Sequence, residues 1–122
     1  MYPDAEVEIV EAHHDRKLDA PSGTALALME AVREVRPEAE AVTGRSGQGK
    51  RRPEEVGIHA IRMGNIVGIH EVMIGTRNET LTLKHEAHSR GVFADGSLKA
   101  AAFLIGKKPG LYNMKDLLQE KD

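Results

Sequence analysis

The sequence contains no cysteine and no tryptophan, and only two tyrosines and two phenylalanines among its 122 residues. Without cysteine, the chain has no disulfide, no thiolate nucleophile and no cysteine-ligated metal. Because aromatic side chains are so few, the core must be built mainly from aliphatic residues. The missing cysteines fit a cytoplasmic protein, and we take the cytoplasm as the expected location.

Long apolar runs and a strong charge imbalance are missing too. No run approaches the roughly 20 apolar residues that a membrane span needs. The first residues, MYPDAEVE, are acidic and lack the basic-then-apolar layout of a signal peptide. The net charge of -2 argues against general affinity for nucleic acid. We therefore predict a single domain over residues 1–122, with neither a membrane nor a nucleic acid as partner.

The hydrophobic pattern predicts an α+β fold: a mostly antiparallel (mixed) four-stranded sheet with helices on one face. Alternating residues predict strands over 7–11, 58–61, 66–75 and 80–88, and the last strand is expected to be half-buried. Helical spacing predicts helices over 22–36, from 96 to about 105, and from 113 onward. Residues 41–53, AVTGRSGQGKRRP, are rich in glycine and basic residues and predict a solvated loop.

Ionisable residues are concentrated in residues 8–25, EIVEAHHDRKLDAPSGTA. His13 and His14 come at the end of the first predicted strand, and Lys17 follows three residues later. Histidine and lysine can both deliver a proton near neutral pH when their surroundings adjust them. A surface histidine pair beside a solvated lysine is the simpler interpretation of these three residues taken alone.

The segment PSGT at 21–24 predicts a helix start that can receive an anion. The first amides of a helix have no intrahelical partner and lie at the positive end of its dipole. Gly23 lets a ligand approach the backbone closely, and Thr24 adds a hydroxyl. Capping of the helix by Ser22 is the alternative, and the two roles are compatible. Together with the nearby cations, this segment suits a substrate with one or two carboxylates.

The same stretch resembles the substrate-site signature of the bacterial 4-hydroxy-tetrahydrodipicolinate reductases, also called dihydrodipicolinate reductases. The resemblance continues in GIHAIRMGNIVGIHEVMIG, ETLTLKHEAHSRGVFADGSLKAA and KKPGLYNM, so it covers nearly the whole chain. It implies an oxidoreductase of lysine and diaminopimelate biosynthesis that converts 4-hydroxy-tetrahydrodipicolinate to tetrahydrodipicolinate. The hydride donor would be NADPH or NADH. The resemblance also implies a homotetramer assembled through the sheet of this domain.

The resemblance implies roles for single residues. His13 would be the general acid/base, and Lys17 would donate the proton to the carbon that is reduced. The substrate-binding residues would be His14, Ser22, Gly23 and Thr24, with the last two holding a carboxylate. Arg90, in HSRGVF, is a further substrate-binding candidate, and a surface arginine at a strand end is its alternative.

The Rossmann domain of that family has no counterpart in the sequence. The nearest glycine-rich segment, GRSGQG at 44–49, has the wrong glycine order, and Pro53 stands where a helix should run. The chain therefore resembles the substrate-binding and oligomerisation domain alone. Its helical tail, about 93–122, would normally pack on the missing nucleotide-binding domain, which would also bind the cofactor. We expect the isolated chain to be inactive. The sequence is compatible with three origins: an expressed fragment, a proteolytic product or a split gene product.

Two other interpretations of the chain stay open. In the first, the chain is a non-catalytic fragment that only forms a homo-oligomer. In the second, its basic loop at 45–52 binds nucleic acid. The second is disfavoured because no aromatic residue is interleaved with the basic ones. His85 and His88 do not suggest a metal site, since residues three apart on a strand face opposite sides. We predict no metal.

Overall fold

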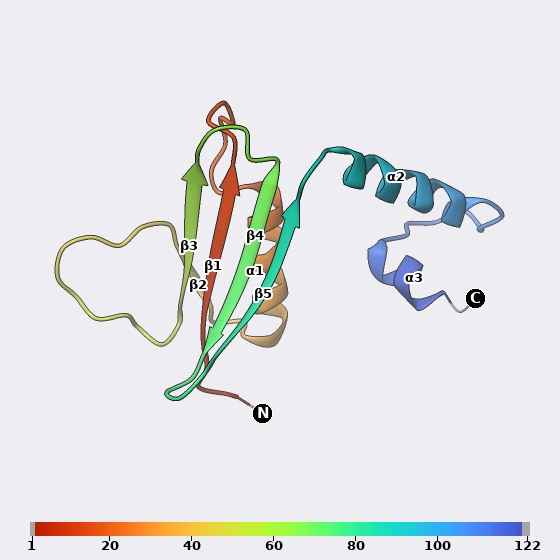
Figure 1. The fold of residues 1–122 in the computed structure, drawn as a ribbon. Coiled ribbons are helices and arrows are strands. Elements are labelled where there is room, and N and C mark those ends of the chain that lie inside the picture. The colour runs from red at the N-terminus through yellow and green to blue at the C-terminus, as the bar shows by residue number, and fades with distance from the viewer. Residues whose placement is uncertain (1, 121–122) are drawn as a thin grey trace. The chain divides into compact units, whose positions relative to one another are not determined.

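The computed structural model describes residues 2–120, which fall into two compact units. The first unit ends at His88 and the second begins at Ser89. In chain order the elements are β1 (Glu6–His13), α1 (Gly23–Val35), β2 (Glu40–Val42), β3 (Glu55–Arg62), β4 (Gly68–Gly75), β5 (Thr80–Ala87), α2 (Gly91–Leu104) and α3 (Met114–Gln119) (Figure 1). No helix within residues 2–120 has the length and apolar character that crossing a membrane requires.

The first unit is built around a mixed sheet with the strand order β2-β3-β1-β4-β5. The central strand β1 is parallel to β3 and antiparallel to β4. At the edges, β2 is parallel to β3, and β5 is antiparallel to β4.

The prediction of a mixed sheet in an α+β fold is confirmed. The predicted four strands and mostly antiparallel pairing are wrong, because the described sheet has five strands and its pairings divide evenly. The missed strand, β2, is only three residues long and shows no periodicity of its own.

The core lies between the sheet and α1, which covers one face of it (Figure 1). We call this side the α1 face. Val7, Ile9 and Ile58 point into the core from β1 and β3, and Ala25 and Met29 meet them from α1. These two helix residues lie four apart and so share one face of the helix. The buried cluster is aliphatic, as the scarcity of aromatic residues predicts.

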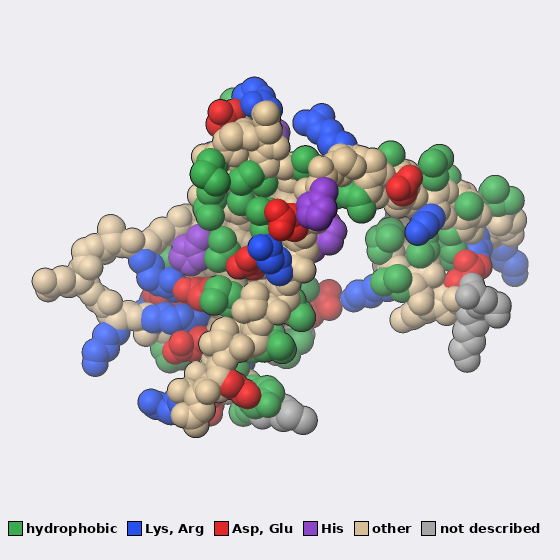
Figure 2. All heavy atoms as spheres, in the orientation of Figure 1, with side chains coloured by type: hydrophobic (Ala, Val, Ile, Leu, Met, Phe, Trp, Pro, Cys, Tyr) green, Lys and Arg blue, Asp and Glu red, His purple; other side chains and the backbone are tan. Residues whose placement is uncertain are grey.

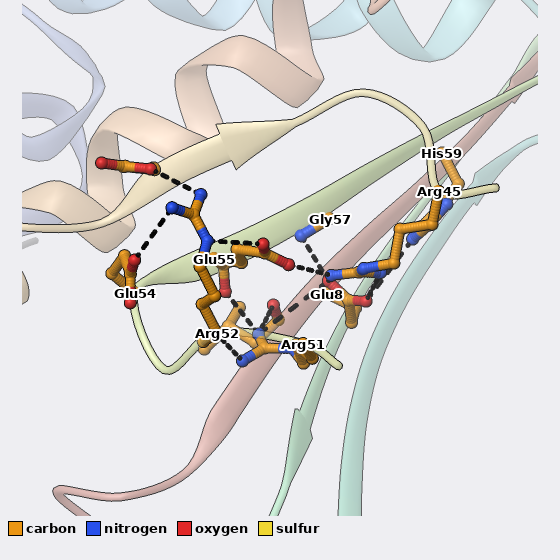
Figure 3. Close-up of polar contacts among 10 residues, drawn as sticks. Glu8, Arg45, Arg51, Arg52, Glu54, Glu55, Gly57 and His59 are labelled. Atoms are coloured by element: carbon orange, nitrogen blue, oxygen red, sulfur yellow. Dashed lines mark hydrogen bonds and ion pairs between the residues drawn. The ribbon is translucent and has the colours of Figure 1, made fainter. Parts of the chain in front are cut away.

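The opposite side of the sheet, which we call the polar face, carries Glu8, His59, Glu71, Met73 and Lys84 on neighbouring strands. Figure 2 shows basic and acidic side chains lying beside one another on this face. Glu8 accepts hydrogen bonds from the Arg45 side chain and the Gly57 N–H (Figure 3). Burial alone would raise the pKa of Glu8, but these bonds and the charge of Arg45 outweigh it, and the pKa lies below its ordinary value.

The basic loop between β2 and β3 is tied to this face. Arg45 and Arg51 pair with Glu8, and Arg52 pairs with Glu55, with Nε to Oε1 at 3.0 Å (Figure 3). The prediction of a loop is confirmed for most of the segment. Arg45 and Arg52 stay exposed as predicted, and only Arg51, whose side chain is 17% exposed, is largely covered.

Two expected details of the outer elements are also wrong. Along β5 only Ala87 is buried, whereas Leu81 and Leu83 are 57% and 59% exposed, so the strand is not half-buried within this chain. The second helix, α2, begins at Gly91 and not after Gly96. An interior glycine weakens a helix by only about 0.5–1 kcal/mol, which the flanking helix-forming residues offset.

The second unit confirms the other helix boundaries. Gly106, with φ of 79°, follows the end of α2 as a glycine stop. Asn113 caps α3, and the side chain of Asp116 reaches back to the Asn113 N–H. No residue of α2 is fully buried: Phe103 is partly covered by Tyr112 and Lys107, whereas Val92, Leu98 and Leu104 are exposed among the described residues.

Candidate functional site

The candidate site is organised by Glu11, a fully buried carboxylate on the α1 face. Four hydrogen bonds reach its two oxygens. His13 Nδ1 lies 2.6 Å from Oε2, and the Ser22 N–H lies 3.2 Å from Oε1. Arg62 binds both oxygens, Nη1 to Oε2 at 2.9 Å and Nη2 to Oε1 at 2.8 Å. A planar guanidinium suits such two-point binding of a carboxylate.

The fold explains why these four residues meet. Glu11 and His13 are alternate residues of β1, so both side chains point to the α1 face. Arg62 is the register partner of His13 on the parallel strand β3. Ser22 is the N-cap of α1, and its hydroxyl accepts the Ala25 N–H, which confirms the predicted cap. The end of β1, the end of β3 and the start of α1 therefore converge on one carboxylate.

The neighbours of Glu11 keep its carboxyl group ionised. Burial alone would raise the pKa of Glu11, because a buried charge loses its hydration. The hydrogen bonds from Arg62 and His13, the charge of Arg62 and the Ser22 N–H together outweigh burial. The pKa of Glu11 therefore lies below its ordinary value of 4.5.

A second histidine, His70, joins the site from β4, where it is the register partner of Glu11. Its Nε2 lies 3.0 Å from the Ser22 hydroxyl, and its ring meets that of His13 edge-on, with centroids 5.1 Å apart. Burial, and after it the charge of His13, lower the pKa of His70 below its ordinary value of 6.5, while Glu11 opposes them. His85 and Lys17 add smaller lowering effects.

The loop between β1 and α1 carries the remaining candidates. Lys17 Nζ lies 2.9 Å from Asp19 Oδ1, and the Lys17 side chain is 22% exposed. Arg62 holds this loop by donating to the backbone carbonyl of Asp19 at 2.9 Å. His14 accepts the Arg16 N–H through Nδ1 at 3.2 Å. The charge of Lys17 is close enough to contribute to the lowering of the His70 pKa.

The structure brings most of the predicted residues to one end of β1. His13 and Ser22 meet through Glu11, and Gly23 and Thr24 follow directly as the first exposed residues of α1. A Cβ at Gly23 would have no atom within 4 Å, so a ligand can approach its backbone. Arg90 comes just before α2, in the second unit, and its substrate-binding role stays a prediction.

Sequence reasoning missed three contributors to this site. Glu11 stands in the quoted motif, yet it was given no role. A signal was available, because Glu11 continues the core-facing row of Val7 and Ile9, and an acid in such a row needs a partner. Arg62 and His70 carry no comparable local signal. They reach the site only through strand register, which the sequence does not display.

The chain matches the family described as "Dihydrodipicolinate reductase, C-terminus" over residues 1–118. The chain belongs to this family. That assignment confirms the resemblance seen in the sequence.

Members of the dihydrodipicolinate reductase family resemble the chain closely over part of their length. It is 54% identical over 117 residues to the 4-hydroxy-tetrahydrodipicolinate reductase of Caldanaerobacter subterraneus subsp. tengcongensis, covering 94% of this chain and 47% of the relative. It is 50% identical over 119 residues to that of Clostridium tetani, covering 97% of this chain and 47% of the relative. The chain spans about half the length of the curated relatives it matches.

A solved structure of the family also matches. The dipicolinate-bound dihydrodipicolinate reductase from Paenisporosarcina sp. TG-14 superposes with a TM-score of 0.71 at 28% identity. The match covers 91% of this chain and 44% of that chain. The fold described above is therefore shared with part of this reductase.

Replacing Arg62 by methionine should strongly destabilise the first unit. The variant leaves the buried carboxylate of Glu11 without its cationic partner, so we expect the free energy of unfolding to fall by about 3–5 kcal/mol. Urea denaturation at neutral pH measures this loss. Arg52→Met is the matched control, because the Arg52 ion pairs are well exposed, and it should lose much less. Equal losses in the two variants would contradict the importance given to the Glu11–Arg62 pair.

The stability contributed by Glu11 should depend on pH. Because its pKa in the folded chain is depressed, the contribution is fully present above the ordinary value of 4.5 and is lost as pH falls through the folded pKa. Denaturation of the wild type and Glu11→Gln at a series of pH values measures it. The difference in unfolding free energy should be largest near neutral pH and should shrink in acid. A difference that is the same at every pH would argue against an ionised Glu11.

Proposed function

We propose that the chain is the substrate-binding and proton-donating half of a cytoplasmic, NAD(P)H-dependent reductase. The reaction is the conversion of 4-hydroxy-tetrahydrodipicolinate to tetrahydrodipicolinate in lysine and diaminopimelate biosynthesis. Family membership and the names of the relatives support this proposal. The observation that carries it is the bridge formed by Glu11, which binds the His13 ring and the Ser22 N–H at once. An acid/base candidate is thereby held next to a helix start.

The helix start supplies donors for a carboxylate. The first amides of α1 have no intrahelical acceptor, and the Ala25 N–H is taken by the Ser22 hydroxyl. The N–H groups of Gly23 and Thr24 are then left to bind an anion, next to the Thr24 hydroxyl. Lys17 pairs with the carboxylate of Asp19. A dicarboxylate substrate carries two groups of the same kind, so Lys17 can bind one of them. His14, on the same loop, belongs to the proposed substrate-binding set, as do Ser22 and Arg90.

The conversion adds a hydride and a proton to the substrate and releases its 4-hydroxyl group as water. In this proposal Lys17 delivers the proton to the carbon that is reduced, and His13 acts as the general acid/base. NADPH or NADH, when bound by a nucleotide-binding domain, supplies the hydride. The glycine-rich segment 44–49 does not offer a dinucleotide site in this chain, because it lies in the loop between β2 and β3 and does not open a helix. The isolated chain should therefore be unable to complete the reaction.

A calorimetric titration with pyridine-2,6-dicarboxylate tests the proposed site without the cofactor. We expect the 122-residue chain to bind this planar dicarboxylate, and Lys17→Ala to bind it about tenfold to a hundredfold more weakly, as expected for loss of a hydrogen bond to a charged group. Lys50→Ala, on the exposed loop beyond β2, is the matched control and should bind as the wild type does. Absence of binding, or equal binding by Lys17→Ala, would count against the proposed substrate site.

The second candidate function is assembly into a homo-oligomer, with or without catalysis. We propose the polar face as the assembly surface and a homotetramer as the state. Two observations support this. The polar face lies opposite α1, and β5 at the sheet edge exposes most of its side chains. A surface with both signs of charge and exposed Thr80 and Thr82 can pair with its own copy, because each charge meets an opposite one.

Light scattering of the purified chain tests this assembly. We expect the mass of a tetramer for the wild type and a smaller species for Met73→Glu, because the added charge lies at the centre of the polar face. Val35→Glu, on the exposed end of α1, is the control and should keep the wild-type mass. A monomeric wild type would rule out assembly by this chain, and an unchanged mass for Met73→Glu would move the interface elsewhere.

A further inference from the structure

We propose that Glu11, held by Arg62, is the positioning residue of the site: it fixes the proton of neutral His13 on Nδ1 and leaves Nε2 as the nitrogen that exchanges a proton. This inference rests on the proposed function, because it assigns the two nitrogens of the proposed acid/base to different tasks. It concerns only residues of this chain and can be tested without the cofactor.

The direction of the Glu11–His13 hydrogen bond follows from the other partners of Glu11. An ionised carboxylate can only accept hydrogen bonds, and guanidinium and backbone N–H groups can only donate them. Arg62 and the Ser22 N–H therefore require acceptor oxygens on Glu11. His13 Nδ1, 2.6 Å from Oε2, must then be the donor. The neutral imidazole thus carries its proton on Nδ1, and Nε2 has a free lone pair.

Glu11 itself has no capacity left for a substrate. A carboxylate offers about four acceptor positions, and four donor atoms already occupy them. The residue is also fully buried. Glu11 therefore acts through His13 and through the start of α1. Arg62 supplies the positive charge that keeps the buried carboxylate ionised, and without it the direction of the hydrogen bond would no longer be enforced.

A glycine on β4 keeps the other ring nitrogen uncrowded. A Cβ built on Gly68 would lie 3.3 Å from His13 Nε2, closer than such contacts usually are, and at an ordinary contact distance of 3.7 Å from Cδ2. An alanine there would push the ring aside by a few tenths of an ångström, while the Nδ1 side of the ring would keep its partner. Gly68 and Glu11 thus act on opposite ends of one imidazole.

Long-range ¹H–¹⁵N spectra of the histidine side chains test the inference directly in the uniformly labelled 122-residue chain. We expect neutral wild-type His13 to show a protonated Nδ1 and an unprotonated Nε2. In Glu11→Gln, the amide oxygen is expected to face Ser22 and the amide NH₂ to face His13. His13 Nδ1 must then accept a hydrogen bond from this NH₂, so the ring proton should move to Nε2. Exposed His88 is the internal control, whose spectrum should not change.

Each outcome decides the inference. A proton on Nε2 in the wild type, or an unchanged tautomer in Glu11→Gln, would overturn it. Should Glu11→Gln fail to fold, the wild-type spectrum still decides the tautomer. Gly68→Ala then provides the second variant, with Nδ1 still protonated and the Nε2 resonance shifted. The dicarboxylate titration is independent of these spectra. If the wild-type chain shows the expected tautomer but does not bind the dicarboxylate, the proposed function is contradicted, while the assignment of the His13 proton to Nδ1 stands.

Discussion

The buried charge of Glu11 is the constraint on which the candidate site depends. A carboxylate without access to water is tolerated only when its hydrogen bonds are complete and an opposite charge lies close. Here the partners come from β1, from the end of β3 and from the start of α1. If any of these partners moved, the buried carboxylate would lose one of its hydrogen bonds. His13, Arg62 and the start of α1 are therefore all held in place. The proposed chemistry uses the rigidity that these hydrogen bonds provide.

The same physical solution appears on the other side of the sheet in a weaker form. Glu8, three residues before Glu11, lies on the polar face and gathers Arg45 and Arg51 from the loop between β2 and β3. Its side chain is 26% exposed, so water shares the task of solvating it. Consequently Glu8 binds a surface loop, whereas Glu11 joins the ends of β1 and β3 to the start of α1. Depth in the structure, not the kind of partner, makes the difference.

Local signals in the sequence were sufficient for α1, its Ser22 cap, the glycine stop at Gly106 and the family itself, because each is written in contiguous residues. Features that depend on register were not accessible. Arg62 and His70 reach the site because their strands align with β1, and no spacing in the sequence reports that alignment. The three-residue β2 is too short to show a period. The exposure of β5 was misjudged because alternation reveals which residues share a face, not whether anything covers that face.

The central strand serves both faces of the domain on alternate residues. Val7, Ile9, Glu11 and His13 face the helix, and Glu8 and Val10 face the other way. A single inserted or deleted residue within β1 would therefore exchange the two sets, since strand side chains have a period of two. The acid that orients the histidine would be turned to the polar face, and an apolar residue would replace it in front of Arg62. Both faces of the sheet therefore require β1 to keep its number of residues. Substitutions within the strand can be accommodated, but insertions and deletions cannot.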